Sequence, residues 1–332
     1  MSRPRVSVLL PVRDGEDSLA ECLESLSAQT LSDFEVIAVD DGSADGTLGI
    51  LETHARADSR FRVLRQEPAG VVAASQRARG EARAPLVARM DADDVALSER
   101  LELQVAAIEE EGLAAVGGRV EYFPEPTDGL RAYAGWLNSL VTVEAALRDL
   151  WVECPLPGPG LTVRAELMSY RDRGWPEDYD LVLRIWEAGG RFRNVDALVH
   201  RWRDHPGRLT RTDDAFTLDA FRRCKVHFLR RSLLAGGRAA VVWGAGPTGK
   251  AFARELLAAG TPLAAFVEVD PRKLGKRIHG APVVPVERAA DFPEALALGA
   301  VSGAEGRARV RERAAGLGLV EGRDFVAVAC AA

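Results

Sequence analysis

A chain of 332 residues is too long for one ordinary hydrophobic core, so we expect two domains. Its composition, 47% hydrophobic and 28% charged, is that of a globular protein and excludes a disordered or fibrous one. A net charge of -6 and an aromatic content of 6% argue against nucleic acid as a partner, because single-strand binders need a basic groove with aromatic platforms.

The first part of the chain alternates short apolar runs with amphipathic stretches. The pattern predicts strands at 6–12, 34–39, 61–64 and 86–90, and helices at 18–28, 47–57 and 71–83. This alternation indicates βαβ units and a mostly parallel sheet, whose ligands bind outside the carboxyl ends of the strands. Three strand ends carry Pro11, Asp40-Asp41 and Asp91-x-Asp93, so we expect acidic side chains to converge on one edge of the sheet.

The middle of the chain is less regular. A proline- and glycine-rich loop occupies 155–160, a helix is predicted at 178–188, and a short segment follows at 192–199. A long charged helix at 213–234 leads to Gly236-Gly237, which is typical of a linker. A second α/β domain then begins, with strands at 239–243 and 264–269 around a helix at 250–259.

The cellular compartment is predicted from cysteine usage and apolar runs. The four cysteines are far apart and lack the CxxC spacing of a zinc site, which is typical of reduced thiols in a cytosol. No signal-peptide pattern follows Met1, and no apolar run reaches the roughly 18–20 residues of a membrane span. We therefore expect a cytoplasmic protein. The arginine-rich stretch 222–231 is either a solvated helix face or a weak peripheral contact with anionic lipid headgroups.

The segment Asp91-Ala92-Asp93-Asp94 is a candidate metal site at a strand end. Mg²⁺ and Mn²⁺ prefer oxygen ligands and commonly combine one or two carboxylates with substrate phosphates. A solvated loop in which Asp94 caps the next helix would have the same pattern. The further acidic stretches Asp40-Asp41 and Glu177-Asp178 favour the metal site.

Motifs along residues 5–212 resemble glycosyltransferase family 2 in their order and spacing. They are Val6–Val12 with Asp40–Ser43, the DxD-type stretch Arg89–Asp94, the acidic stretch Trp175–Asp180 and the closing stretch Arg201–Gly207. The resemblance implies a GT-A fold and an inverting, metal-dependent enzyme of hexosyltransferase type. Such an enzyme moves a sugar from a nucleotide diphosphate to an acceptor hydroxyl in glycan or polysaccharide biosynthesis.

The resemblance also implies roles for individual residues. The nucleotide-sugar site would comprise Pro11, Val12, Asp14, Asp41, Asp91 and Glu177. Within it, Asp41 would accept uracil N3–H, which favours a UDP-linked donor over a cytidine one, and Asp91 would reach the ribose. Asp93 and His205 would ligate Mg²⁺ or Mn²⁺, with a solvated histidine as the alternative. Asp178 would deprotonate the acceptor hydroxyl, although acids at a helix N-terminus are also favoured by the helix dipole alone.

Some positions differ from the family pattern. Arg13 and Asp14 stand where an aromatic residue and Asn are common, and Gln76 stands where Asn is common. The chain lacks a QxxRW-like segment, so we expect one sugar to be added per encounter. Recognition of a glycan or lipid-linked acceptor is expected at the 154–162 loop and at Trp175, whose ring either stacks on a sugar or belongs to the core.

The second domain carries Gly244-x-Gly246-x-x-Gly249 between a strand and a helix, the context of a phosphate-binding turn. Glu268, at the next strand end, is placed to accept a ribose hydroxyl, whereas Pro247 within the turn argues against a nucleotide site. Residues 266–284 resemble small Rossmann-like modules fused to sugar-modifying enzymes and found at the front of sugar acyltransferases. A bound nucleotide and a structural module, such as one that forms a homo-oligomer, both remain open.

The sequence therefore predicts an α/β protein with a GT-A-type, mixed, mostly parallel sheet domain at 1–212, a helical linker at 213–237 and a smaller Rossmann-like domain at 238–332. The expected function is that of a nucleotide-sugar-dependent glycosyltransferase. The alternatives are a non-catalytic nucleotide-sugar sensor and an oxidoreductase centred on the second domain. Asp178 distinguishes the transferase from the sensor, because a transferase needs a base and a sensor does not.

Overall fold

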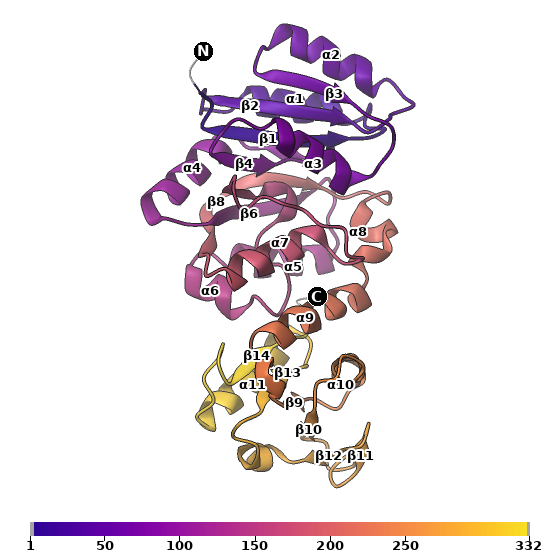
Figure 1. Ribbon diagram of the computed structural model, residues 1–332, viewed down its shortest axis with the longest axis vertical. Coiled ribbons are helices and arrows are strands. Elements are labelled where there is room, and N and C mark those ends of the chain that lie inside the picture. The colour runs from indigo at the N-terminus through magenta and orange to yellow at the C-terminus, as the bar shows by residue number, and fades with distance from the viewer. Residues whose placement is uncertain (1–2, 331–332) are drawn as a thin grey trace. The chain divides into compact units, whose positions relative to one another are not determined.

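The computed structural model describes residues 3–330, which form two compact units (Figure 1). The first unit comprises the residues up to 146, together with 155–173 and 177–208. The second comprises 147–154, 174–176 and the residues from 209 onward. Two short segments, 147–154 and 174–176, which the sequence assigns to the first domain, thus pack within the second unit.

The first unit is built around an eight-stranded mixed sheet in the order β3-β2-β1-β4-β7-β6-β8-β5. Its strands are β1 (Val6–Val12), β2 (Phe34–Asp40), β3 (Phe61–Arg65), β4 (Leu86–Arg89), β5 (Val95–Ala96), β6 (Ala115–Phe123), β7 (Thr162–Arg164) and β8 (Phe192–Arg203). The strands β1 to β4 run parallel, whereas β7 is antiparallel to both of its neighbours. Both β1 and β2 are buried along their whole length, which explains their uninterrupted apolar sequences.

The predicted strands and helices of residues 6–90 are confirmed to within two residues at each end. The helices of this unit are α1 (Leu19–Ser27), α2 (Thr47–Ala57), α3 (Val71–Glu81), α4 (Arg100–Glu111), α5 (Asp128–Asn138), α6 (Val143–Arg148), the 3-10 turn η1 (Gly158–Gly160) and α7 (Glu177–Glu187). The segment predicted at 192–199 is the first part of β8, which continues to Arg203 beside β6. Sequence patterns assigned no element between 95 and 150, where β5, α4, β6, α5 and α6 lie.

The second unit holds a six-stranded, mostly parallel sheet in the order β11-β12-β10-β9-β13-β14. Its elements are α8 (Leu209–Thr212), η2 (Asp214–Phe216), α9 (Leu218–Arg231), η3 (Ala235–Gly237), β9 (Ala240–Trp243), α10 (Pro247–Ala258), β10 (Leu263–Val267), β11 (Arg277–Ile278), β12 (Ala281–Val284), η4 (Val286–Asp291), β13 (Leu296–Gly299), α11 (Ala304–Gly316) and β14 (Phe325–Ala327). Strand order reverses at β9, between β10 and β13, which makes the carboxyl end of β9 a topological switch point.

Two helix boundaries in the second unit differ from the prediction. The helix predicted at 213–234 is wrong at both ends, because η2 and the Thr217 cap, which accepts the Ala220 N–H, delay its start to Leu218. The helix predicted from 250 begins at Pro247 instead. Proline is favoured at the first helical position, where its missing N–H costs no hydrogen bond. Pro247 therefore opens the helix rather than disrupting the glycine turn.

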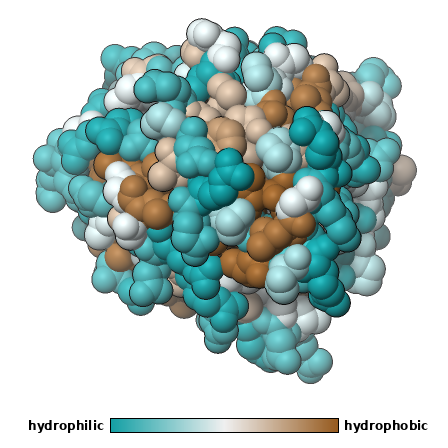
Figure 2. Space-filling view, turned by 90° about the horizontal axis from the view of Figure 1, so that it is seen from below, coloured by the Kyte–Doolittle hydropathy of each residue, from teal (hydrophilic) through white to brown (hydrophobic). Residues whose placement is uncertain are grey.

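The surface shown in Figure 2 is largely hydrophilic, with apolar residues gathered near the centre of that face. Among the described residues the most exposed large apolar side chains are Leu218 at 68% and Val269 at 63%. Within residues 3–330, none of the helices has both the length and the apolar character that crossing a membrane would require.

Candidate active site

The acidic strand ends of the first unit leave its sheet on the same side. Both β2 and β4 pair in parallel with β1, so their carboxyl ends lie on either side of that strand, with Asp40 opposite Val12 and Arg89 opposite Leu9. The Asp41 N–H donates to Val12 O at 2.8 Å, and the Met90 N–H donates to Leu9 O at 3.0 Å. The predicted convergence on one edge of the sheet is therefore confirmed for the backbone.

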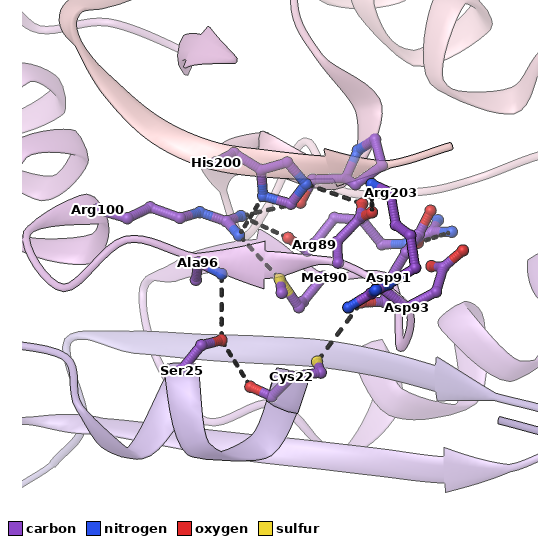
Figure 3. Close-up of polar contacts among 12 residues, drawn as sticks. Cys22, Ser25, Arg89, Met90, Asp91, Asp93, Ala96, Arg100, His200 and Arg203 are labelled. Carbon is purple, nitrogen blue, oxygen red and sulfur yellow. Dashed lines mark hydrogen bonds and ion pairs between the residues drawn. The ribbon is translucent and has the colours of Figure 1, made fainter. Parts of the chain in front are cut away.

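The loop after β4 presents three carboxylates near one point. One oxygen each from Asp91, Asp93 and Asp94 lies within 4.8 Å of the others. Arg89 Nε donates to Asp91 Oδ1 at 2.8 Å (Figure 3). His205 Nε2 lies 2.8 Å from Asp93 Oδ2. The structure thus brings together the two residues, Asp93 and His205, that the sequence assigned to a metal.

Asp94 differs from its neighbours because it is buried and both of its carboxylate oxygens have protein partners. Its Oδ2 lies 2.8 Å from His200 Nε2, and its Oδ1 accepts the Arg203 N–H at 2.8 Å. Burial, with the nearby charges of Asp93 and Asp91, raises the pKa of Asp94. Burial also lowers the pKa of His200 to about 3, so the imidazole is neutral. Asp94 therefore anchors the loop to β8.

The remaining two carboxylates fit a hard divalent cation. Both Arg89 contacts of Asp91 are made to Oδ1, and the His205 contact of Asp93 is made to Oδ2. Each carboxylate therefore keeps its other oxygen for a ligand, and such oxygens are what Mg²⁺ and Mn²⁺ prefer. Asp91, Asp93 and His205 are the residues that could hold the ion.

Arg89, at the end of β4, connects the aspartate loop to the Glu177-Asp178 motif. Its side chain is 5% exposed, with Nη2 2.7 Å from Asp91 Oδ1 and Nη1 3.7 Å from Glu177 Oε1. Its guanidinium carbon lies 5.5 Å from the centre of the Tyr170 ring. Burial opposes its charge, but the charges of Asp91 and Glu177 help to raise the pKa of Arg89 overall. One permanently charged side chain thus holds both acidic motifs.

Glu177 and Asp178 form the first turn of α7. Burial raises the pKa of Asp178 to about 6 and, together with the Asp178 charge, raises that of Glu177 to about 7. Asp178 Oδ1 accepts the Tyr179 N–H at 2.7 Å, and its Oδ2 lies so close to Gly158 that a Cβ there would be 2.5 Å away. A partly exposed carboxylate with a pKa near neutral can act as a general base.

Asp41, the predicted nucleobase ligand, accepts three hydrogen bonds from the segment after β3. Gln66 Nε2 and the Ala69 N–H donate to Oδ1 at 2.7 and 2.8 Å, and the Gly70 N–H donates to Oδ2 at 2.8 Å. A carboxylate has about four acceptor positions, so one position remains on Oδ2.

The other predicted nucleotide-sugar residues lie in two places. Pro11 and Val12 are buried within β1, and Asp14 accepts the Ala44 N–H at 2.8 Å, which supports the loop after β2. Asp91 and Glu177 are instead joined through Arg89.

Several expectations about neighbouring residues need correction. Asp180, an acid close to Asp178 in sequence, is neutralised by Arg171 at 2.7 Å and Arg184 at 2.8 Å, so burial rather than this charge is the main cause of the raised pKa of Asp178. The 154–162 segment, expected to bind the acceptor, is buried throughout. Trp175 lies in the second unit with its ring 5.2 Å from that of His227.

The glycine fingerprint of the second unit forms a tight strand-to-helix turn. Gly244 has a φ of 102°, a Cβ at Gly249 would lie 1.8 Å from Gly244 O, and a Cβ at Gly246 would meet nothing within 4 Å. Glu268 accepts the Ala245 N–H at 3.1 Å and pairs with Lys273 at 2.8 Å. Its carboxylate therefore braces the turn, and its role toward a ribose stays a prediction.

Arg89, Arg100, His200 and Arg203 contribute to the site but were not predicted. A charged residue at the end of the apolar run Leu86–Arg89 is a signal that could have revealed the first of them. His200 is likewise a polar side chain within a strand, β8, and it is 0% exposed. Arg100 lies in a helix that the sequence analysis left unassigned.

Comparisons with known proteins show which families and folds this chain is similar to. Residues 7–167 match the family model described as glycosyl transferase family 2. EpsJ of Bacillus subtilis (strain 168), named as an uncharacterized glycosyltransferase, is 29% identical over 217 residues, which are 62% of this chain and 63% of EpsJ. EpsE of the same organism is 28% identical over 239 residues, 66% of this chain and 80% of EpsE. The matched region thus spans less than two thirds of EpsJ.

Solved structures share the fold of the first unit. TarS 1–349 of S. aureus, in complex with UDP-GlcNAc, has a TM-score of 0.54 at 20% identity, covering 68% of this chain and 66% of that one. The mannosyltransferase PcManGT of Pyrobaculum calidifontis, in complex with GDP-Man and Mn²⁺, has a TM-score of 0.53 at 20% identity, covering 78% and 76%. The first sheet is therefore GT-A-like, and residues 7–167 are similar to a glycosyl transferase family 2 domain.

Proposed function

We propose that this chain is an inverting, metal-dependent glycosyltransferase that moves a hexose-type sugar from a nucleotide diphosphate to an acceptor hydroxyl in polysaccharide biosynthesis. The observation that carries the proposal is the link through Arg89 between the aspartate loop and a carboxylate pair of raised pKa. A donor-binding motif and a base are both needed for transfer, and one buried side chain holds them together.

In this proposal Asp178 accepts the proton of the acceptor hydroxyl as its oxygen attacks the anomeric carbon. A pKa of about 6 leaves Asp178 mostly ionised at neutral pH and more basic than an exposed aspartate. Glu177 binds the donor beside it, and Asp91 reaches the ribose. Asp93 and His205 hold Mg²⁺ or Mn²⁺, which when bound neutralises charge on the diphosphate.

Uridine is the nucleoside that best suits Asp41. Three of its acceptor positions are filled by protein N–H groups, so one donor of a base can be accepted. Uracil offers the single N3–H, cytosine offers no such donor, and guanine presents two adjacent N–H groups. TarS, which is similar in fold, has been solved with UDP and with UDP-GlcNAc, and this supports the same choice.

The sensor alternative has no use for a base, and an oxidoreductase centred on the second unit would leave the acids of the first unit without a role. The proposal also includes the division into domains at 1–212, 213–237 and 238–332. It further includes a nucleotide bound in the last of these, at Gly244, Gly246, Gly249 and Glu268. In that division the first range transfers the sugar.

Thermal unfolding with UDP, GDP, CDP, dTDP and NAD, each with Mn²⁺ or a chelator, tests the donor site without an acceptor. A selectively bound ligand at 100 times its Kd stabilises the folded state by about 2.7 kcal/mol. We expect UDP to stabilise the protein only with Mn²⁺. Stabilisation by NAD alone would contradict the transferase and support the oxidoreductase.

Release of UDP from UDP-sugars, with water or an oligosaccharide as acceptor, tests the base. Asp178→Asn is expected to keep UDP affinity and lose about 10²–10⁴-fold in turnover. The matched control is Glu52→Gln, an exposed carboxylate on α2, which should keep full turnover. Unchanged turnover in Asp178→Asn would refute the base assignment.

A further inference from the structure

Two buried polar side chains on α4 lie behind the site and contact the segments that carry it. Arg100 and Gln104 are 1% and 0% exposed and, at a spacing of four residues, share one face of the helix. Burying a guanidinium is strongly unfavourable unless its donors are satisfied. Its partners therefore indicate why a charge is kept at this position.

Arg100 contacts both halves of the site. Its Nη2 donates to Arg89 O, directly before the aspartate loop, and to Pro159 O at 3.0 Å, in the turn that lies against Asp178. Gln104 Nε2 donates to Gly160 O at 2.7 Å in the same turn, and its Oε1 accepts the Thr162 hydroxyl at 2.7 Å. The helix thus holds the end of β4 and the 158–160 turn together.

A second connection runs from Arg100 to Asp94 through His200, and Figure 3 shows the Arg100 and His200 side chains that form its first part. Arg100 Nη1 lies 3.4 Å from His200 Nδ1, and His200 Nε2 lies 2.8 Å from Asp94 Oδ2. Arginine can only donate, so Nδ1 accepts and the proton of the neutral imidazole resides on Nε2, which donates to Asp94. Arg100 thereby orients His200, the partner through which Asp94 anchors the aspartate loop to β8.

An ordinary stabilising ion pair does not explain Arg100. Within residues 3–330 its partners are carbonyl oxygens, an imidazole, an amide oxygen and the Met90 sulfur, and no carboxylate lies within ion-pair distance. The Arg100 side chain instead orients three segments that are distant from one another in sequence. These contacts fix the relative positions of the three segments, although they require a buried charge.

We propose that Arg100, acting with Gln104 and His200, is a positioning residue that sets the spacing between the metal-holding aspartate loop and the Asp178 base. This inference rests on the proposed function and adds to it the residues that keep the two parts of the reaction in register. The two arms are separable: His200 acts on the aspartate loop and Gln104 acts on the turn beside Asp178.

The experiment compares Arg100→Met with Arg164→Met. Arg164 also donates to main-chain oxygens, Leu113 O at 2.8 Å and Ile108 O at 3.4 Å, but lies opposite Leu86, at the start of β4. Mn²⁺ affinity is measured by electron paramagnetic resonance without donor, and kcat and KM by UDP release from a UDP-sugar. Both are measured well below each variant's unfolding temperature.

We expect Arg100→Met to weaken Mn²⁺ binding about 10–100-fold and to lower kcat at least as much, with Arg164→Met near wild type. His200→Phe should lose Mn²⁺ affinity, and His200→Gln, which keeps a donor toward Asp94, should recover part of it. Gln104→Met should lower kcat and leave Mn²⁺ affinity unchanged. These single-arm variants also decide the matter if Arg100→Met fails to fold.

Equal Mn²⁺ affinity and kcat in Arg100→Met and Arg164→Met would overturn the inference while leaving the proposed function intact. So would single-arm variants that change stability alone. A wild-type protein that neither binds Mn²⁺ nor releases UDP would overturn the proposed function, and this inference with it.

Discussion

At the scale of single residues, the candidate site combines carboxylates in contrasting environments. Asp41 accepts three hydrogen bonds from protein N–H groups, whereas burial opposes the charges of Asp94 and Asp178 and raises the pKa of both. A group kept in an unfavourable ionisation state is often functional, because catalysis uses the basicity that folding has to supply. Two predictions follow from Asp178 and the glycine beside it.

Asp178→Asn is expected to stabilise the protein at neutral and alkaline pH. Burial raises the pKa of Asp178 to about 6, from about 3.9 in an unfolded chain, so the folded state binds more protons between these values. Wild-type stability therefore falls as pH rises through this window, and the neutral amide avoids the loss. Urea unfolding should show a gain of roughly 1–3 kcal/mol near pH 8 and none below about pH 4. Equal stability near pH 8 would contradict the raised pKa.

Gly158→Ala is expected to lower transfer with little change in stability. The added methyl would lie 2.5 Å from Asp178 Oδ2, and the end of a flexible side chain can move away cheaply. A displaced base should reduce turnover about 10–100-fold, because transfer requires close alignment. Turnover and unfolding temperature are measured beside Gly135→Ala, an open position on α5 where activity should be unchanged. Full turnover in Gly158→Ala would show that the turn does not position Asp178.

At the scale of elements, strand ends and helix starts carry most of the polar groups of the candidate site. The N-terminal turn of α7 supplies Glu177 and Asp178, and α4 supplies the buried Arg100. In the second unit the turn from β9 into α10 needs Gly244 for its positive φ and Gly249 for a close backbone approach, whereas Gly246 faces open space. This turn can be tested separately from transfer.

Gly249→Ala is expected to destabilise the second unit, and Gly246→Ala is expected to be tolerated. A Cβ at Gly249 would lie 1.8 Å from a backbone oxygen, which cannot move without shifting β9 or α10, whereas Gly246 faces open space. Overpacking of this kind costs about 1–3 kcal/mol or more. Urea unfolding followed by circular dichroism measures both variants. Equal stability would mean that the turn differs from the one described.

At the scale of the whole molecule, two compact units each carry a sheet with a polar carboxyl edge. The family match ends at residue 167, and the proposed donor site lies within the first unit. A nucleotide could therefore bind one unit without the other. Hydrogen exchange distinguishes these cases, since ligand contact protects the backbone locally.

UDP with Mn²⁺ is expected to slow hydrogen exchange in peptides that contain 11–14, 66–70, 89–94 and 203–205, and to leave 244–249 unchanged. The physical reason is that loop amides at the strand ends lose access to water when the nucleotide binds. Mass spectrometry with and without a chelator measures the effect. Protection at 244–249 alone would place the nucleotide in the second unit and contradict the proposed donor site.

Local patterns predicted the strands that are buried along their whole length. The runs of β1 and β2 are apolar because both faces of those strands are covered, so their bounds could be predicted almost to the residue. The strand β6 was not predicted, because it contains two glycines and exposes Arg119 and Glu121. Its sequence therefore shows no continuous apolar run.

The sequence by itself determined that acidic side chains follow two parallel strands, β2 and β4, and that they therefore meet at one edge of a sheet. Strand direction is enough for that conclusion. Only the tertiary structure decided which carboxylates are available to a ligand. Asp94 contacts His200 and Arg203. Asp180 forms ion pairs with Arg171 and Arg184, whereas Asp178 faces a glycine turn. Ionisation and hydrogen bonding depend on burial and on partners distant in sequence, and the folded packing alone supplies both.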